Sequence, residues 1–139
     1  MTTEQTIAFA RQIVRTECDA VRRLEAYIDD NFVEIARTIF RSRGRLIITG
    51  IGKSAIIANK IVATLNSTGQ PAVFMHAADA IHGDLGIIQP DDIILCISKS
   101  GNSPEIKVLV PFIRQMGNLL IGMAGNLESF LEQHSGRVL

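Results

Sequence analysis

Short apolar runs that lack in/out alternation recur after residue 45, and segments with a helical pattern separate them. The runs lie at 46–49, 72–75, 92–97 and 118–123. The helical segments lie at about 53–67, 78–81 and 103–116. Strands without alternation are typical of a parallel sheet that helices cover on both faces. The pattern therefore predicts an α/β fold: a three-layer, doubly wound parallel sheet of flavodoxin-like order 2-1-3-4-5, with GRVL at the end of the chain starting a fifth strand.

The first 42 residues carry apolar side chains at three- and four-residue steps, which predicts one or two extra N-terminal amphipathic helices over about 3–42. This is more helix than one sheet needs, so the surplus is expected to pack either on a second subunit or on its own sheet. Gly44 follows the segment and suits a left-handed turn after a helix. Cys18 and Cys96 have neither metal-knuckle nor disulfide spacing and are predicted to be packing residues.

Length and charge restrict the function classes. The chain has 139 residues, which is one ordinary domain, and its 14 basic residues balance 14 acidic ones. A balanced charge argues against binding to nucleic acid or an anionic membrane. The polar N-terminus lacks the pattern of a signal peptide, and no apolar stretch approaches a membrane span, so a cytoplasmic protein is expected.

A glycine turn follows the first apolar run, with the sequence Thr49-Gly50-Ile51-Gly52-Lys53-Ser54, and a helix begins at once. Glycines let the backbone approach a ligand, and free amides at a helix start favour an anion, which makes Gly50, Gly52 and Ser54 candidate binding residues. The spacing matches neither the dinucleotide fingerprint nor a P-loop. No cofactor is therefore expected.

A second turn follows the third apolar run and is rich in hydroxyl groups: Ser98-Lys99-Ser100-Gly101-Asn102-Ser103-Pro104-Glu105. Ser103 is the expected N-cap and Pro104 the first helical residue. Three serine hydroxyls, an asparagine and free amides supply enough donors to hold a phosphate without a metal. The alternative is that Ser103 only caps the helix while Ser98 and Ser100 fill a turn.

With the strand order 2-1-3-4-5, both turns lie where the order reverses and a crevice opens, so they form one site. The loop after the second strand, from Met75 to Gly86, brings His76 and His82 beside it. A lone histidine is more often structural, but this pair in one loop favours a functional role.

At these residues the sequence resembles the sugar isomerase (SIS) domain family. The turn from Ser98 to Glu105 has the family's serine-rich pattern, and GIGKS with HGDLG resembles its arabinose 5-phosphate isomerase group. The resemblance implies interconversion of D-ribulose 5-phosphate and D-arabinose 5-phosphate by a homo-oligomer, either a dimer or a tetramer. The product would feed the synthesis of 3-deoxy-D-manno-octulosonate (Kdo), a sugar of Gram-negative lipopolysaccharide and capsules.

The family also sets an expectation for the domain. Many relatives carry a pair of C-terminal CBS modules, and the family continues beyond the position of Leu139 with a loop and a helix that complete the site. We therefore expect residues 1–139 to be a single SIS domain that lacks its C-terminal portion.

The resemblance and the isomerase chemistry together assign roles. Glu105 is the expected base, His82 the acid/base relay and Lys53 the electrostatic stabiliser, and Glu105 and His82 can exchange roles. The phosphate-loop positions are Ser98, Ser100, Gly101, Asn102 and Ser103. His76 matches a histidine associated with substrate or with zinc, and zinc is expected to inhibit.

The remaining expectations concern one feedback ligand and two alternative functions. The activated form of Kdo is expected to compete with the substrate as a feedback inhibitor, because it carries anionic groups that suit the same turn. An isomerase of another phosphosugar is one alternative function. A non-catalytic sugar-phosphate sensor is the other.

Overall fold

The structure is a computed structural model that describes all 139 residues as two compact units, Met1–Glu34 and Ile35–Leu139. The first unit holds α1 (Thr3–Arg23), a 3-10 helix η1 (Leu24–Tyr27) and the start of α2 (Asp30–Arg41). The helices expected before residue 42 are confirmed. No helix of the chain is both long enough and apolar enough to cross a membrane.

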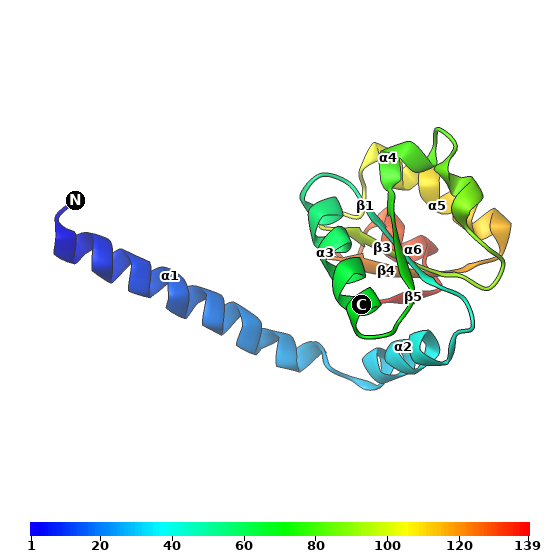
Figure 1. The fold of residues 1–139 in the computed structure, drawn as a ribbon. Coiled ribbons are helices and arrows are strands. Elements are labelled where there is room, and N and C mark those ends of the chain that lie inside the picture. The colour runs from blue at the N-terminus through cyan, green and yellow to red at the C-terminus, as the bar shows by residue number, and fades with distance from the viewer. The chain divides into compact units, whose positions relative to one another are not determined.

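Helix α1 is one continuous helix of 21 residues (Figure 1). A capping box begins it, in which the Thr2 side chain accepts from the Gln5 amide and the Gln5 side chain accepts from the Thr2 amide. The helix has no buried residue. Cys18 is exposed on it in the single chain and does not join the core, whereas Cys96 is buried in the core as predicted.

Five parallel strands form the sheet in the order β2-β1-β3-β4-β5, as the apolar runs predicted. Their bounds are β1 Leu46–Gly50, β2 Ala72–His76, β3 Ile93–Ser98, β4 Leu119–Ala124 and β5 Arg137–Val138. Every residue of β1 and β3 is buried, which explains why neither strand alternates between apolar and polar residues.

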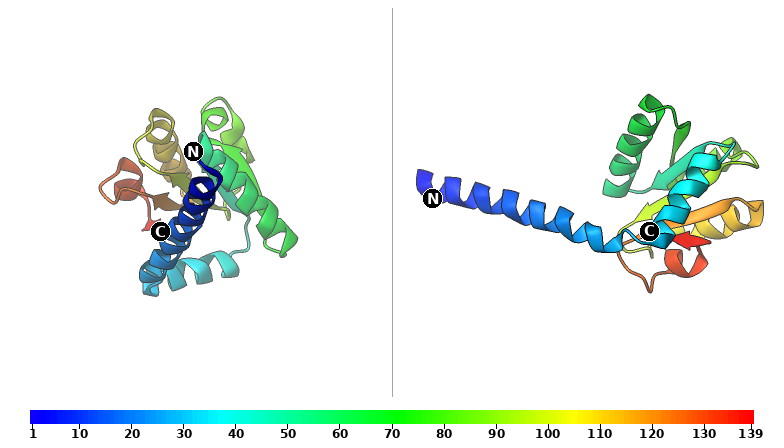
Figure 2. Two further views of the ribbon diagram at one scale, coloured as in Figure 1. Left: turned by 90° about the vertical axis from the view of Figure 1, so that its left-hand side faces the viewer. Right: turned by 90° about the horizontal axis from the view of Figure 1, so that it is seen from below.

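Helices cover both faces of this sheet (Figures 1 and 2). They are α2 from Ile35 onward, α3 (Lys53–Ser67), α4 (Ala77–Ala80), the 3-10 helix η2 (Asp84–Ile87), α5 (Pro104–Met116) and α6 (Phe130–His134). Alternate residues of one strand enter opposite cores: Ile47 packs with side chains of α4 and α5, and Ile48 packs with side chains of α3. The three-layer prediction is confirmed.

Two local features differ from the sequence prediction. The short helix α6 was not expected, because five residues are too few to show a helical period. Gly44 was expected in a left-handed turn, but its φ is not positive. Instead, a Cβ at Gly44 would overlap the backbone carbonyl of Asp91, so glycine is needed there for close approach of two chain segments.

An ion pair joins the amino-terminal ends of β1 and β3, opposite the glycine turns. The Arg45 guanidinium donates to both Asp92 carboxylate oxygens at 3.2 and 2.6 Å, and the amides of Arg45 and Gln89 also donate to them, each at 2.8 Å. Burial alone would raise the pKa of Asp92, but these hydrogen bonds outweigh burial and hold the pKa below its usual value.

This pair predicts an acid-sensitive contribution to stability. A lowered pKa stabilises the folded state above the unfolded pKa of about 4, and the stabilisation is lost as pH falls through the folded value. We expect Asp92→Asn to lower the free energy of unfolding by about 1–3 kcal/mol at pH 7 and by much less at pH 2. Urea titrations at both pH values measure this, with the exposed neighbour Asp91→Asn as control. An equal loss at both pH values would contradict it.

Candidate functional site

The predicted site residues gather at one edge of the sheet, where β2, β1 and β3 lie side by side and end together. Gly50, the last residue of β1, pairs in register with His76 at the end of β2 and with Ile97 near the end of β3. The chain order reverses at β1, since β2 lies on one side of it and β3 on the other. Both glycine turns therefore open at the topological switch point, where α/β folds bind ligands.

The first turn depends on two glycines for different reasons. Gly52 has φ 59° and ψ −126°, a backbone conformation that side chains disfavour, and it is the N-cap of α3. A Cβ at Gly50 would lie 3.0 Å from the Ile97 carbonyl oxygen and 3.2 Å from the Ser54 Cβ. Lys53 is thus placed at the first position of α3 with an exposed side chain, and Ser54 follows it half-buried.

Two serines of the second turn shape its backbone. The buried Ser98 hydroxyl accepts a hydrogen bond from the Gly101 amide at 3.1 Å, and the exposed Ser100 hydroxyl accepts from the Asn102 amide at 3.3 Å. These two amides are therefore occupied within the turn. Each hydroxyl still has its hydrogen to donate to a ligand.

Helix α6 holds the second turn in place. The Asn102 side chain donates to the Ser100 carbonyl at 3.0 Å and accepts from the Phe130 amide at 3.0 Å, and the Gly101 carbonyl accepts from the Leu131 amide at 3.0 Å. Asn102 was predicted as a substrate ligand, but here both ends of its amide bind the protein. Its position makes it part of the frame of the turn.

Ser103 occupies the N-cap of α5 without capping it. The hydroxyls of Thr2 and Ser129 each accept from a first-turn amide of their own helix, as N-cap residues usually do, whereas the Ser103 hydroxyl makes no such bond. The Ser103 Oγ is buried and has no hydrogen-bond partner in the protein. The start of α5 thus offers both free amides and a free hydroxyl, which is the arrangement that binds an anion.

Three buried side-chain polar atoms in the chain lack a hydrogen-bond partner: Thr49 Oγ1, His76 Nδ1 and Ser103 Oγ. They belong to the carboxyl ends of β1 and β2 and to the turn that follows β3. A buried polar group without a partner costs about 1–3 kcal/mol, so such groups are expected where a ligand or water binds. Sequence patterns did not point to Thr49, whose only signal is a hydroxyl in an otherwise aliphatic run.

The predicted catalytic side chains lie at the same edge and are free of protein partners. Glu105 is half-buried in the first turn of α5, where the helix dipole favours a carboxylate. Lys53 and His82 are exposed at the start of α3 and just after α4. No group of three histidine, cysteine or acidic side chains gathers where it could hold a metal ion.

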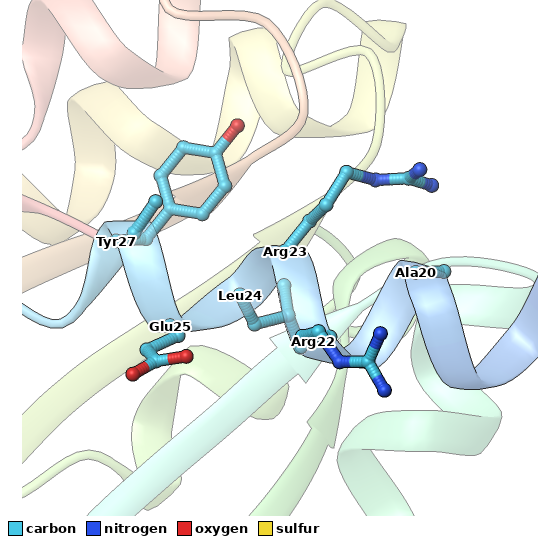
Figure 3. A pocket seen from close by; sticks show the side chains of 7 residues that line it. Ala20, Arg22, Arg23, Leu24, Glu25 and Tyr27 are labelled. Carbon is cyan, nitrogen blue, oxygen red and sulfur yellow. The ribbon is translucent and has the colours of Figure 1, made fainter.

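Two hollows of the surface are lined by other residues. Figure 3 shows the first, whose side chains all come from residues 20–27 of one helical stretch and point in different directions, as Tyr27 and Glu25 do. The second lies where β4 and β5 begin, among Arg114, Asn118 and His134. Neither hollow includes a predicted site residue.

The fold defines the class of protein: a doubly wound α/β domain whose two glycine turns meet at the topological switch point. Residues 39–139 match the SIS domain, and the chain belongs to that family. Arabinose 5-phosphate isomerase KdsD of Pseudomonas aeruginosa is 45% identical over 120 residues, which are 86% of this chain and 37% of that protein. Arabinose 5-phosphate isomerase GutQ of Salmonella typhimurium is 42% identical over 129 residues, which are 93% of this chain and 40% of that protein.

The chain therefore spans about two fifths of the length of these curated relatives. Among solved structures, the complex of E. coli CFT073 c3406 with arabinose 5-phosphate aligns with a TM-score of 0.94 and 33% sequence identity. That alignment covers 99% of this chain and 73% of the other.

Proposed function

We propose that this chain is the SIS domain of an aldose-ketose isomerase that interconverts D-ribulose 5-phosphate and D-arabinose 5-phosphate. The observation that carries the proposal is the uncapped start of α5, where Ser103 presents a free hydroxyl at the switch point beside a free carboxylate, Glu105. The similarity to relatives named arabinose 5-phosphate isomerase supports the choice of sugar.

The reaction moves a proton between C1 and C2 of the sugar. A base takes the C1 proton of the ketose while the C2 oxygen gains a proton, which gives an enediol. A proton then leaves the C1 oxygen and another is delivered to C2, so atoms and charge balance without a redox cofactor. Glu105 is the proposed base, His82 the relay between the oxygens, and Lys53 the cation that stabilises the developing enediolate. Glu105 and His82 can exchange roles.

The phosphate is the part of the substrate that the second turn would hold. We expect Ser103→Ala to weaken binding of D-arabinose 5-phosphate by about 10- to 100-fold, because a hydrogen bond to a charged group contributes about 1.5–3 kcal/mol. Ser100→Ala should weaken it less, since the Ser100 hydroxyl is exposed and already shared with the Asn102 amide. Calorimetric titration measures both affinities. Unchanged affinity in Ser103→Ala would remove the phosphate role.

Two other functions remain distinguishable by experiment. An isomerase of another phosphosugar would turn over a heptose or hexulose phosphate in preference to D-ribulose 5-phosphate. A sugar-phosphate sensor would bind its ligand and convert nothing. The free carboxylate of Glu105 beside the free hydroxyl of Ser103 favours an enzyme, because binding a phosphate alone does not need a negative group there.

The proposal extends to the cellular setting. The product would feed Kdo synthesis in the cytoplasm, where phosphorylated sugars are made and used.

The exposed apolar residues of α1 indicate an interface between copies of the chain. They are Ile7, Phe9, Ile13, Val14 and Val21, and we infer a homo-oligomer, a dimer or a tetramer, that covers them. Sedimentation of the wild type and Val14→Glu tests this, since only the variant should dissociate.

Feedback would act at the same turn. Activated Kdo carries a carboxylate and a phosphate, so we expect it to inhibit competitively and to inhibit Ser103→Ala more weakly. Initial rates at several D-ribulose 5-phosphate concentrations measure this. Inhibition that substrate does not overcome would place the regulator elsewhere.

Zinc should inhibit through His76, because two histidines are fewer ligands than a resident zinc site needs. Activation by zinc would contradict that role.

A further inference from the structure

The environment of His76 is asymmetric. Its Nδ1 is buried and has no hydrogen-bond partner, while the side chain as a whole is 34% exposed. The carboxylate of Asp79 lies close to it, with Oδ2 3.8 Å from Nδ1. The Phe74 ring meets the imidazole edge-on, with the ring centroids 6.2 Å apart. Nδ1 is therefore the ring nitrogen that faces a carboxylate, and Nε2 makes no hydrogen bond with the protein.

Local chain geometry explains why the Asp79 carboxylate lies near the His76 imidazole. His76 is the N-cap of α4, and its side chain makes no capping bond. Asp79 is three residues further on, the position whose acidic side chain reaches back toward the N-cap in a capping box. Here it reaches back to the imidazole. A distance of 3.8 Å is too long for a hydrogen bond, but the Asp79 side chain is 65% exposed and free to rotate the remaining distance.

We propose that Asp79 is a positioning residue for His76. Its carboxylate accepts a hydrogen bond from Nδ1–H, which fixes the tautomer in which Nε2 carries the lone pair. Nε2 can then accept a hydrogen bond from a hydroxyl group of the sugar. Carboxylates orient metal-binding histidines in this way through the second ring nitrogen, and their loss typically costs about 10- to 100-fold in metal affinity or activity. We expect a loss of the same order here. The effect on turnover rests on the proposed function.

The tautomer is measured directly by nitrogen NMR of the imidazoles at pH 8. The chain has three histidines, so His76→Asn assigns the His76 signal by its disappearance. We expect His76 to be mainly protonated at Nδ1 in the wild type, to shift toward the Nε2–H tautomer in Asp79→Ala, and to return in Asp79→Glu. Asp91→Ala, an exposed aspartate elsewhere, should leave the signal unchanged. A wild-type His76 protonated mainly at Nε2 would overturn the proposal. So would an Nδ1–H tautomer that stays unchanged in Asp79→Ala.

A double-mutant cycle tests the functional part. Asp79→Ala should lower kcat/KM for D-ribulose 5-phosphate about 10-fold, and the double variant His76→Asn, Asp79→Ala should match His76→Asn alone. Losses that multiply would show that Asp79 does not act through His76 and would overturn its positioning role. A wild-type protein that binds the sugar phosphate but converts none would refute the proposed function, and the tautomer measurement would still decide the Asp79 contact.

Discussion

Replacing Glu105 with glutamine is expected to lower turnover by about 10²- to 10⁴-fold, while D-arabinose 5-phosphate still binds. Glutamine keeps the shape of the side chain in the first turn of α5 but cannot accept the C1 proton. Glu105 lies in the first turn of α5, at the positive end of the helix dipole, and its carboxylate makes no hydrogen bond or ion pair with another protein group. Single-turnover assays and calorimetric titration of the variant separate the loss of chemistry from the loss of binding.

Glu132→Gln is the matched control, because Glu132 lies in the first turn of α6 as Glu105 does in α5. If both carboxylates only favour their helix ends, the two variants should lose similar small amounts of stability and keep their activity. If Glu105→Gln retains turnover, His82 becomes the base, and His82→Asn should then be the inactive variant.

Gly101→Ala is expected to lower the free energy of unfolding by about 2–5 kcal/mol. Gly101 has φ 63°, a conformation that costs other residues about 1–2 kcal/mol. A Cβ there would also overlap the buried side chain of Ser129, and such overpacking typically costs about 1–3 kcal/mol more. Thermal and urea unfolding measure the loss, and sugar-phosphate binding should weaken with it because Gly101 anchors the second turn to α6.

Gly69→Ala separates the cost of a positive φ from the cost of the overlap with Ser129. Gly69 has φ 91°, and a Cβ at this position would meet no atom within 4 Å, so its variant should lose only the backbone contribution, about 1–2 kcal/mol. Equal losses in the two variants would mean that the contact between Gly101 and Ser129 contributes nothing.

The sequence predicted the sheet closely because its strands are buried on both faces. In β1 and β3 each apolar run ends at a glycine or serine turn, so both the strand and its end are visible in the chain. Helix α6 was missed because it has only five residues, and what defines it is its contact with a turn about 28 residues earlier. Gly44 was misplaced for a similar reason, since its close neighbour, Asp91, is distant in the chain.

The candidate site was also predicted only in part. The sequence located both turns and therefore the residues that can meet at the switch point. It did not show that Asn102 would be bound to Phe130, that Ser103 would leave its helix uncapped, or that Asp79 would approach His76. Each of these depends on side-chain orientation in the folded chain, which composition and spacing do not determine.

An assay of the full-length protein for conversion of D-ribulose 5-phosphate to D-arabinose 5-phosphate decides whether the proposed activity is correct. Heptose and hexulose phosphates serve as competing substrates, and Glu105→Gln serves as the inactive reference. We expect the pentose phosphate to be converted with the highest kcat/KM. The kcat/KM of Glu105→Gln for it should be at least about 100-fold lower than that of the wild type. Binding of the pentose phosphate without conversion, or preferred turnover of another phosphosugar, would contradict the proposed activity.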